Sequence, residues 1–167
     1  EIPLRLVGSE MCIRDRGADE LFAGYHWYPL VDGADDAYSA YRKAFFDREH
    51  DEYAACVQPA WLTDDVSGEF VRQHFAQPGA SAAVDKALRL DSTVMLVDDP
   101  VKRVDNMTMA WGLEARTPFL DYRVAELSAR IPGQFKLPEG GKYVLKEAAR
   151  KVIPVSYTHL TLPTNRE

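Results

Sequence analysis

Residues Val94 to Asp121 read VMLVDDPVKRVDNMTMAWGLEARTPFLD, and this stretch decides how the rest of the chain is interpreted. Asp98, Lys102 and Asp105 recur at spacings of four and three, so on a helix they share one face. The apolar side chains of the stretch fall on the other face, which indicates a helix that packs on one side. Buried charges are costly unless they are paired or face a charged ligand. The pattern therefore predicts an internal ion network or, as the alternative, the wall of a polar site.

Three blocks of the sequence follow one another in the order found in a known family. Residues 98–121 resemble the signature segment of the synthetase domain of asparagine synthetase and its relatives. Residues 17–25, GADELFAGY, resemble the family's GADELFGGY block, and residues 141–148, GKYVLKEA, resemble its GKxxLKEA block. Residues 25–29 and 88–93 are most similar to the N-acetylglutaminylglutamine amidotransferase branch of this family.

The two ends of the chain differ in character from its middle. Residues 1–16 and 155–167 resemble translated sequencing-adapter read-through, and we expect both to be non-native. The first of these segments interrupts a motif, because Arg16 stands where the family has the glutamate of a Gly-Glu-Gly step. The role of that glutamate therefore cannot be transferred to this chain. We expect residues 17–154 to be the C-terminal part of an asparagine synthetase-like domain.

Helical periodicity dominates the central residues, and no β-alternation of useful length is visible. The chain is therefore predicted to be a mainly α fragment. The resemblance implies that the parent domain is α/β, similar to the adenine nucleotide alpha hydrolases, with a parallel sheet. Helices are expected within 17–25, over 35–48 and 49–58, from a cap at 63–65 to about 78, and over 82–98, 100–111, 122–130 and 142–151.

Composition narrows the class of protein. The net charge of -6 and the pI of about 5.3 leave no basic surface of the kind that nucleic-acid binding requires. Apolar runs are shorter than the roughly 20 residues of a membrane span, and no secretion signal is visible. We therefore expect a cytoplasmic protein with neither a nucleic-acid partner nor a membrane. Cys56 is the one cysteine outside residues 1–16, and we expect it to be a small core residue.

The resemblance implies a reaction that must manage negative charge at every stage. Members of the family adenylate a carboxylate with ATP and magnesium, release pyrophosphate, and let ammonia displace AMP to form an amide. By motif position, Asp19 matches the aspartate on the magnesium and pyrophosphate side, and Lys142 matches the pyrophosphate lysine. Both are candidates for catalysis and for cofactor binding, and Asp19 is the candidate metal ligand. The alternatives are compensation of a helix dipole by Asp19 and a solvated lysine at position 142.

Lys102, Arg116 and Asp105 also match frequent positions of the family. Lys102 is a candidate for cofactor binding, whereas Arg116 and Asp105 are candidates for contact with the substrate. A guanidinium offers the planar fork that suits a carboxylate. The alternative role of all three residues is to hold the signature helix in place through ion pairs.

The function implied by the resemblance is that of a glutamine-dependent, ATP-consuming amidotransferase, a carbon-nitrogen ligase that needs ATP and Mg²⁺. Its partners would be a small carboxylate acceptor and ammonia from an N-terminal glutaminase domain. The expected product is the amide of N-acetylglutaminylglutamine; aspartate as acceptor, as in asparagine synthetase, is the alternative. A β-lactam-forming synthetase and a non-catalytic helical interaction module are more distant alternatives. The family's Ser-Gly-Gly-x-Asp-Ser loop and the glutaminase domain do not occur in this sequence, so we expect the chain alone to be inactive.

Overall fold

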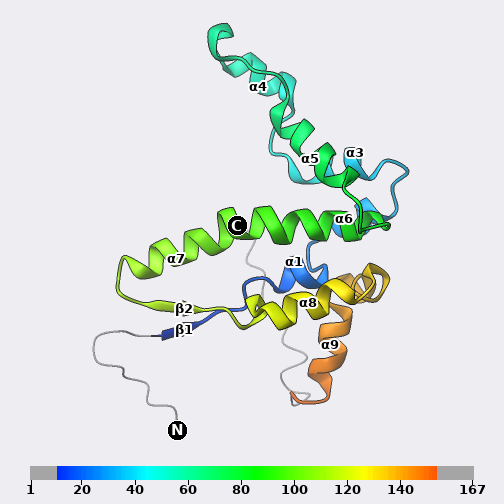
Figure 1. Ribbon diagram of the computed structural model, residues 1–167, viewed down its shortest axis with the longest axis vertical. Helices are drawn as coiled ribbons and strands as arrows, with labels where there is room; N and C mark the ends of the chain where they lie inside the picture. Colours follow the sequence, from blue (N-terminus) through cyan, green and yellow to red (C-terminus); the bar gives the residue numbers. More distant parts are fainter. Residues whose placement is uncertain (1–10, 154–167) are drawn as a thin grey trace.

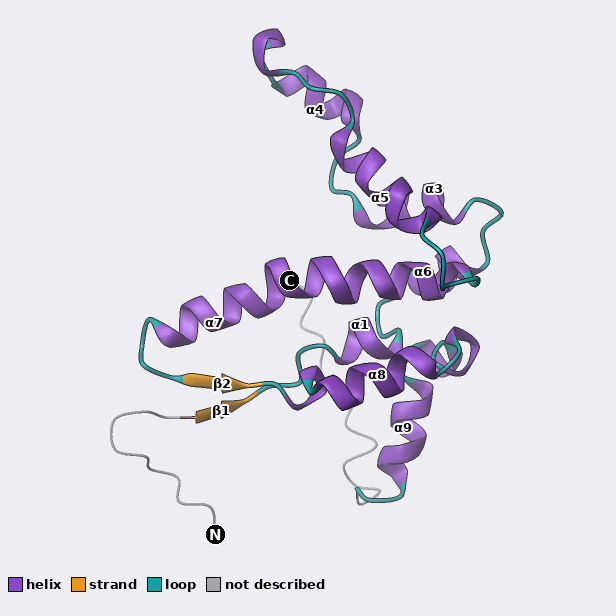
Figure 2. Ribbon diagram, in the orientation of Figure 1, coloured by secondary structure: helices purple, strands orange, loops and turns teal. Residues whose placement is uncertain are grey.

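The computed structural model describes residues 11–153, and helices dominate this part of the chain (Figures 1 and 2). The α-helices are α1 (Ala18–Phe22), α2 (Tyr28–Asp32), α3 (Ala37–Phe45), α4 (His50–Cys56), α5 (Val66–Ala76), α6 (Ala83–Leu90), α7 (Lys102–Met109), α8 (Tyr122–Arg130) and α9 (Tyr143–Arg150). Two π-helical segments, η2 (Asp91–Met95) and η3 (Val97–Val101), lie between α6 and α7. Short 3-10 turns are η1 (Pro59–Trp61), η4 (Pro118–Leu120), η5 (Gly133–Phe135) and η6 (Pro138–Gly140). The prediction of a mainly helical fragment is confirmed.

The hydrophobic core forms where α2, α3, α5 and α6 meet. Aromatic rings fill its centre, since Tyr41 stacks on Phe45 with 5.2 Å between ring centroids and lies 5.3 Å from Phe75. Each large apolar side chain buried in this way contributes about 1.5–3 kcal/mol. The buried members of the core are Ala23, Tyr28, Val31, Tyr41, Val71, Phe75, Val84, Ala87, Leu88 and Leu90.

Helices α3, α4 and α5 form an arm that extends away from the rest of the molecule (Figure 1). The predicted cap at residues 63–65 is confirmed, because the Asp65 side chain accepts a hydrogen bond from the Gly68 N–H at 2.9 Å. Arg42 ties the arm together by donating to Glu49 at 2.6 Å and to Asp65 at 2.5 Å. Cys56 is exposed on α4, so its predicted core position is wrong. The helical pattern is correct there, but α4 lies on the outer part of the arm and has no buried residue.

The segment from α6 to α7 is one long helix, which Figure 2 shows as a continuous coil. The predicted helix break at Pro100 is therefore wrong, because Pro100 lies inside η3 and the linking residue Leu96 keeps helical angles (φ -58°, ψ -42°). Proline lacks the N–H that an α-helix needs and clashes with the preceding turn. A π turn shifts the hydrogen-bonding pattern by one residue, so the long helix can accommodate the ring without ending.

Helix α7 does not pack as the sequence predicts. No α7 residue is buried, Trp111 is 87% exposed, and Asp98, Lys102 and Asp105 all face solvent. The expected buried charge network is therefore wrong for the described residues. The physical reason is position: α7 leaves the core, and its main contacts are with η3 before it and the strand after it.

Strands β1 (Met11–Ile13) and β2 (Glu114–Arg116) pair in parallel, with Met11 opposite Glu114 and Ile13 opposite Arg116. No β-alternation predicts these strands, because three residues are too few to display a period of two. This pair is the whole sheet within residues 11–153.

Helices α8 and α9 complete the fold around α1. The predicted helices over 122–130 and 142–151 are confirmed. The buried hydroxyl of Ser128 on α8 donates to the carbonyl oxygen of Leu21 on α1, which fixes the two helices against each other. Between residues 11 and 153, no helix has the length and apolar character needed to cross a membrane.

Candidate functional site

Asp19 and Lys142, which are far apart in the sequence, meet where α1 approaches the start of α9. The Lys142 Nζ lies 2.7 Å from the Asp19 Oδ1, and the two side chains keep 29% and 34% of their exposure. The pair is therefore reachable from solvent yet partly enclosed. Opposite charges at this distance in a half-buried setting can be separated by a charged ligand, because neither group pays the full cost of burial.

Two glycines allow these segments to approach closely. We call the region formed by residues 19–24 and 141–142 the α1–α9 junction. A side chain at Gly24 would collide with the Asp19 carboxylate and the Lys142 side chain. A side chain at Gly141, whose φ is +90°, would collide with the backbone carbonyl of Ala23. The Lys142 N–H then donates to the Phe22 carbonyl at 2.8 Å, and Lys142 itself adopts a left-handed conformation with φ of 56°. The backbone of residues 141–142 therefore contacts the backbone of residues 22–24 directly.

The junction also contains a buried carboxylate. Glu20 is 2% exposed and accepts a hydrogen bond of 2.6 Å from the Tyr25 hydroxyl. Burial, together with the nearby Glu20 carboxylate, raises the pKa of Tyr25 above its usual value, so this residue remains a neutral donor. Trp27 stacks on Tyr25 with 4.3 Å between ring centroids. The aromatic residues around position 25 therefore hold α1 in place.

A second buried carboxylate anchors the core behind α1. Asp91 is fully buried in η2 and accepts hydrogen bonds from the hydroxyls of Tyr28, at 2.6 Å, and of Tyr41. Burial raises the pKa of Asp91 to about 6, although both hydrogen bonds act in the opposite direction. This group joins α2, α3 and η2 through one side chain. It serves the core, because the three bonded groups are all buried.

The other three predicted site residues lie elsewhere. Lys102 and Asp105 are exposed on α7, which Figure 1 shows extending away from α1 and α9. Arg116 is exposed in β2 and pairs with Glu114 at 3.0 Å. Within residues 11–153, the structure does not bring these three side chains to the Asp19–Lys142 pair.

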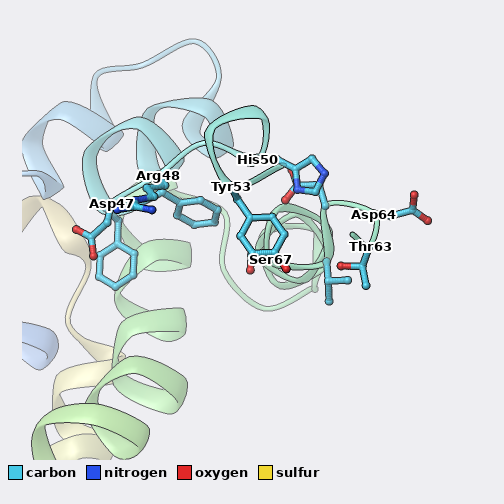
Figure 3. Close-up of a pocket in the computed structure, with 11 residues that line it drawn as sticks. Asp47, Arg48, His50, Tyr53, Thr63, Asp64 and Ser67 are labelled. Carbon is cyan, nitrogen blue, oxygen red and sulfur yellow. The ribbon is translucent and has the colours of Figure 1, made fainter. Parts of the chain in front are cut away.

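The arm contains a pocket of its own, of about 480 Å³. Figure 3 shows His50 and Tyr53 of α4 near Thr63 and Asp64, which precede α5, and near Ser67 of α5, whereas Arg48 lies beside Asp47. None of the predicted site residues lines this pocket. It therefore offers no support for the chemistry that the resemblance implies.

The side chains at the junction determine what kind of metal site it could form. Among the residues that the structure describes, no group of three or more His, Cys, Asp or Glu side chains is arranged to hold a metal ion. Mg²⁺ commonly binds through one or two carboxylates together with phosphate oxygens and water. A single partly exposed carboxylate such as Asp19 fits that mode and does not fit an all-protein metal cage.

Comparison with known proteins decides the family. The family model described as asparagine synthase matches residues 4–160, which is nearly the whole chain. The chain belongs to the asparagine synthase family. No solved structure gives a match to it.

Curated relatives agree with this assignment. The asparagine synthetase [glutamine-hydrolyzing] 1 of Bacillus subtilis (strain 168) is 31% identical over 87 residues, 52% of this chain. The asparagine synthetase [glutamine-hydrolyzing] of Gallus gallus is 33% identical over 88 residues, also 52% of the chain. A Mycobacterium tuberculosis (strain H37Rv) protein that carries the same name provisionally is 24% identical over 203 aligned positions, 95% of the chain. The chain spans 14%, 15% and 30% of these three relatives, respectively.

Sequence reasoning missed the residues that build the junction rather than those that carry its charge. Gly24 and Gly141 stand in the quoted blocks, but only coordinates show that each prevents a collision with the opposite block. Asp91 carried a weak signal, since it is an acidic residue on the apolar face of a predicted helix. Lys136, which is 3% exposed, gave no signal, because it lies in a turn without periodicity.

Proposed function

We propose that this chain is part of the synthetase domain of a glutamine-dependent enzyme that uses ATP to convert a carboxylate into an amide. The observation that carries the proposal is the 2.7 Å contact between Asp19 and Lys142. These residues come from two separate blocks that resemble the family, and both are candidates for handling the same leaving group. A helical interaction module without chemistry has no need for a solvent-accessible carboxylate and amine in one place.

Each partner of the pair has a distinct proposed role. Adenylyl transfer places negative charge on phosphate oxygens, which cations stabilise most effectively when they are held in position beforehand. The Lys142 ammonium would bind the departing pyrophosphate, and the Asp19 carboxylate would hold Mg²⁺, which when bound neutralises phosphate charge. In the absence of ligand the two side chains neutralise each other. Binding of magnesium pyrophosphate would replace this ion pair with two others, one between Lys142 and pyrophosphate and one between Asp19 and Mg²⁺. We expect Lys102, Asp105 and Arg116 to act outside this pair, at the acceptor side or in contacts made by α7.

The proposed acceptor is N-acetylglutaminylglutamine, with aspartate as the alternative. The residues that favour the first acceptor are 25–29, which form the aromatic segment, and 88–93, which span the end of α6 and the start of η2. The curated relatives carry names that point to the second. Both acceptors present a carboxylate to the same adenylation chemistry, so the role of the Asp19–Lys142 pair does not depend on the choice. The ammonia would come from a glutaminase domain of the longer protein, which we place in the cytoplasm.

We also propose that residues 1–16 and 155–167 are non-native and that 17–154 is the family segment proper. The support is Arg16, which stands where the family has a glutamate. Sequencing the source gene across both boundaries tests this directly. The proposal requires a Ser-Gly-Glu-Gly step before Ala18 and a different residue run after Pro154; an unchanged gene would refute it.

The experiment for the function is ATP–pyrophosphate exchange in the longer protein recovered from that gene. With its acceptor present, the intact protein should exchange labelled pyrophosphate into ATP, and Lys142→Met should lower the rate by at least about 100-fold. Lys43→Met serves as the matched control, because it removes the same charge at an exposed site on α3 that has no proposed role, and it should retain most of the exchange. We expect no exchange with the present chain alone. Equal losses in both variants, or full activity in Lys142→Met, would contradict the proposed role.

A further inference from the structure

A cavity of about 800 Å³ lies between the long helix, α8 and the loop that follows α5. Its volume falls in the range of about 300–1,000 Å³ that is typical of small-molecule sites. Glu20 and Leu21 of the junction contribute to its wall, but neither Asp19 nor Lys142 lines it, so the cavity is distinct from the Asp19–Lys142 pair. Much of its wall is apolar, with side chains of Leu88, Leu96, Val97, Val101, Leu120 and Ala125.

One buried lysine, Lys136, belongs to the lining of this cavity. Lys136 is 3% exposed, and its backbone is fixed because its N–H donates to Gly133 at 2.8 Å and its carbonyl accepts from Tyr143 at 3.1 Å. Within residues 11–153 its Nζ has no hydrogen bond and no ion pair, although its side chain lines the cavity. A buried charge without a partner is costly, so this lysine is suited to receive an acceptor from outside the chain.

The other buried polar side chains of the cavity each have at least one partner, although the Arg89 Nε–H is buried without one. Glu20 accepts from Tyr25, and Ser128 donates to the Leu21 carbonyl. The Arg89 guanidinium donates to backbone carbonyls at the end of α5, including that of Pro78 at 2.8 Å. Lys136 is therefore the one buried cation of the cavity that has no bonded partner among the described residues.

Asp85 is the acidic group that acts on Lys136 through space. It favours the charged amine, but the effect of burial is larger, so the pKa of Lys136 lies below its usual value. Asp85 forms no ion pair with Lys136 within residues 11–153. Glu126, the remaining acidic residue of the lining, is exposed on α8 and is solvated.

We propose that this cavity binds a small aliphatic monocarboxylate, with its carboxylate on the Lys136 ammonium and its hydrocarbon body against the apolar wall. A single unpaired cation matches a single negative charge. A phosphate would need further donors, and Arg89 is held by backbone carbonyls. The inference does not rest on the proposed amide-forming function, because the cavity and the junction share no proposed ligand-binding residue.

Calorimetric titration of the purified chain with hexanoate and with 1-hexanol tests the site, because the two probes share a hydrocarbon body and differ in charge. Hexanoate should bind at least about tenfold more tightly than the alcohol, and Lys136→Met should remove that difference. Ser81→Ala, at the exposed rim of the cavity, is the matched control and should leave hexanoate binding unchanged. Aspartate should bind more weakly than hexanoate, because its second carboxylate meets the apolar wall.

A stability measurement separates a ligand-binding lysine from a structural one. Lys136→Met should raise the thermal midpoint of the free chain, because it replaces an unpaired buried charge with an apolar side chain of similar length. A structural lysine would instead lower the midpoint when replaced. If Lys136→Met does not fold, titration of the wild-type chain with hexanoate tests the site by itself. The readout is then the NMR signals of the Lys136 side chain. The proposal is overturned if these signals do not move with hexanoate, if hexanol binds equally well, or if aspartate binds more tightly.

Discussion

The α1–α9 junction and helix α7 both carry blocks that resemble the asparagine synthase family, but they differ in packing. At the junction, two blocks from opposite ends of the described chain are joined by a backbone hydrogen bond, an ion pair and two glycine contacts. Helix α7 has no buried residue, and its charged side chains face solvent. A motif by itself therefore does not identify a site. Convergence of side chains from separate segments is the stronger evidence, and it favours Asp19 and Lys142 over Lys102 and Asp105.

The contact expected to contribute most to the stability of the junction is the close approach of Gly141 to the Ala23 carbonyl. Gly141→Ala should destabilise the chain by about 4 kcal/mol, because it adds a collision with the Ala23 carbonyl to the cost of a positive φ. Gly140→Ala is the matched control, since Gly140 has φ of +78° but open space around it, and should cost only about 1 kcal/mol. Urea denaturation measures both. Equal losses in the two variants would show that the close approach contributes nothing.

A pH titration of stability tests the core behind α1. The pKa of Asp91 is raised from 3.8 to about 6 in the folded chain, so its protonated form is favoured by folding. Its contribution is therefore complete below about pH 4 and is lost as the pH rises through about 6, a change of about 3 kcal/mol. Denaturation of the wild-type chain and of Asp91→Asn across this range gives the difference. A difference that stays constant from pH 4 to 7 would contradict the raised pKa.

The ion pair itself should matter little for stability. Lys142→Met should cost about 1 kcal/mol or less, because both side chains keep roughly a third of their exposure and the pair is screened by water. Its expected effect is on ligand binding, which separates a functional pair from a structural one. Thermal unfolding of this variant provides the test, and a loss of several kcal/mol would assign the pair to the core.

The smallest effect is expected on α7. Lys102→Met should change the free energy of unfolding by less than about 0.5 kcal/mol, since Lys102 is exposed and makes no ion pair within the described residues. The same denaturation measurement applies. A large loss would mean that α7 is packed more closely than residues 11–153 show.

The sequence predicts the helices of this fold well and their surroundings less well. Periodicity and caps located α5, α8 and α9, because these helices depend on local signals such as the Asp65 cap. The π segments were missed because proline normally ends an α-helix, and sequence alone does not show that a π turn accommodates Pro100. Burial of α7 was predicted wrongly, since an apolar stripe indicates a packing face but does not identify its partner.

The candidate site was predictable only in part. The residue types at positions 19 and 142 follow from the blocks that resemble the family. Their contact depends on Gly24 and Gly141, whose importance lies in neighbours more than a hundred residues apart in the sequence. The burial of Lys136 and of Asp91 also depends on long-range packing. The position of Asp91 on an apolar helix face is a weak local signal, and no local pattern distinguishes Lys136 from other charged residues.

The most direct test of the central claim is an NMR titration of the purified chain with magnesium pyrophosphate. We predict chemical-shift changes at residues 19–25 and 141–146 that disappear in Lys142→Met, with no change at Lys102, Asp105 or Arg116. Changes confined to α7 and β2, or identical changes in the Lys142→Met variant, would contradict the claim that Asp19 and Lys142 form one anion-binding site.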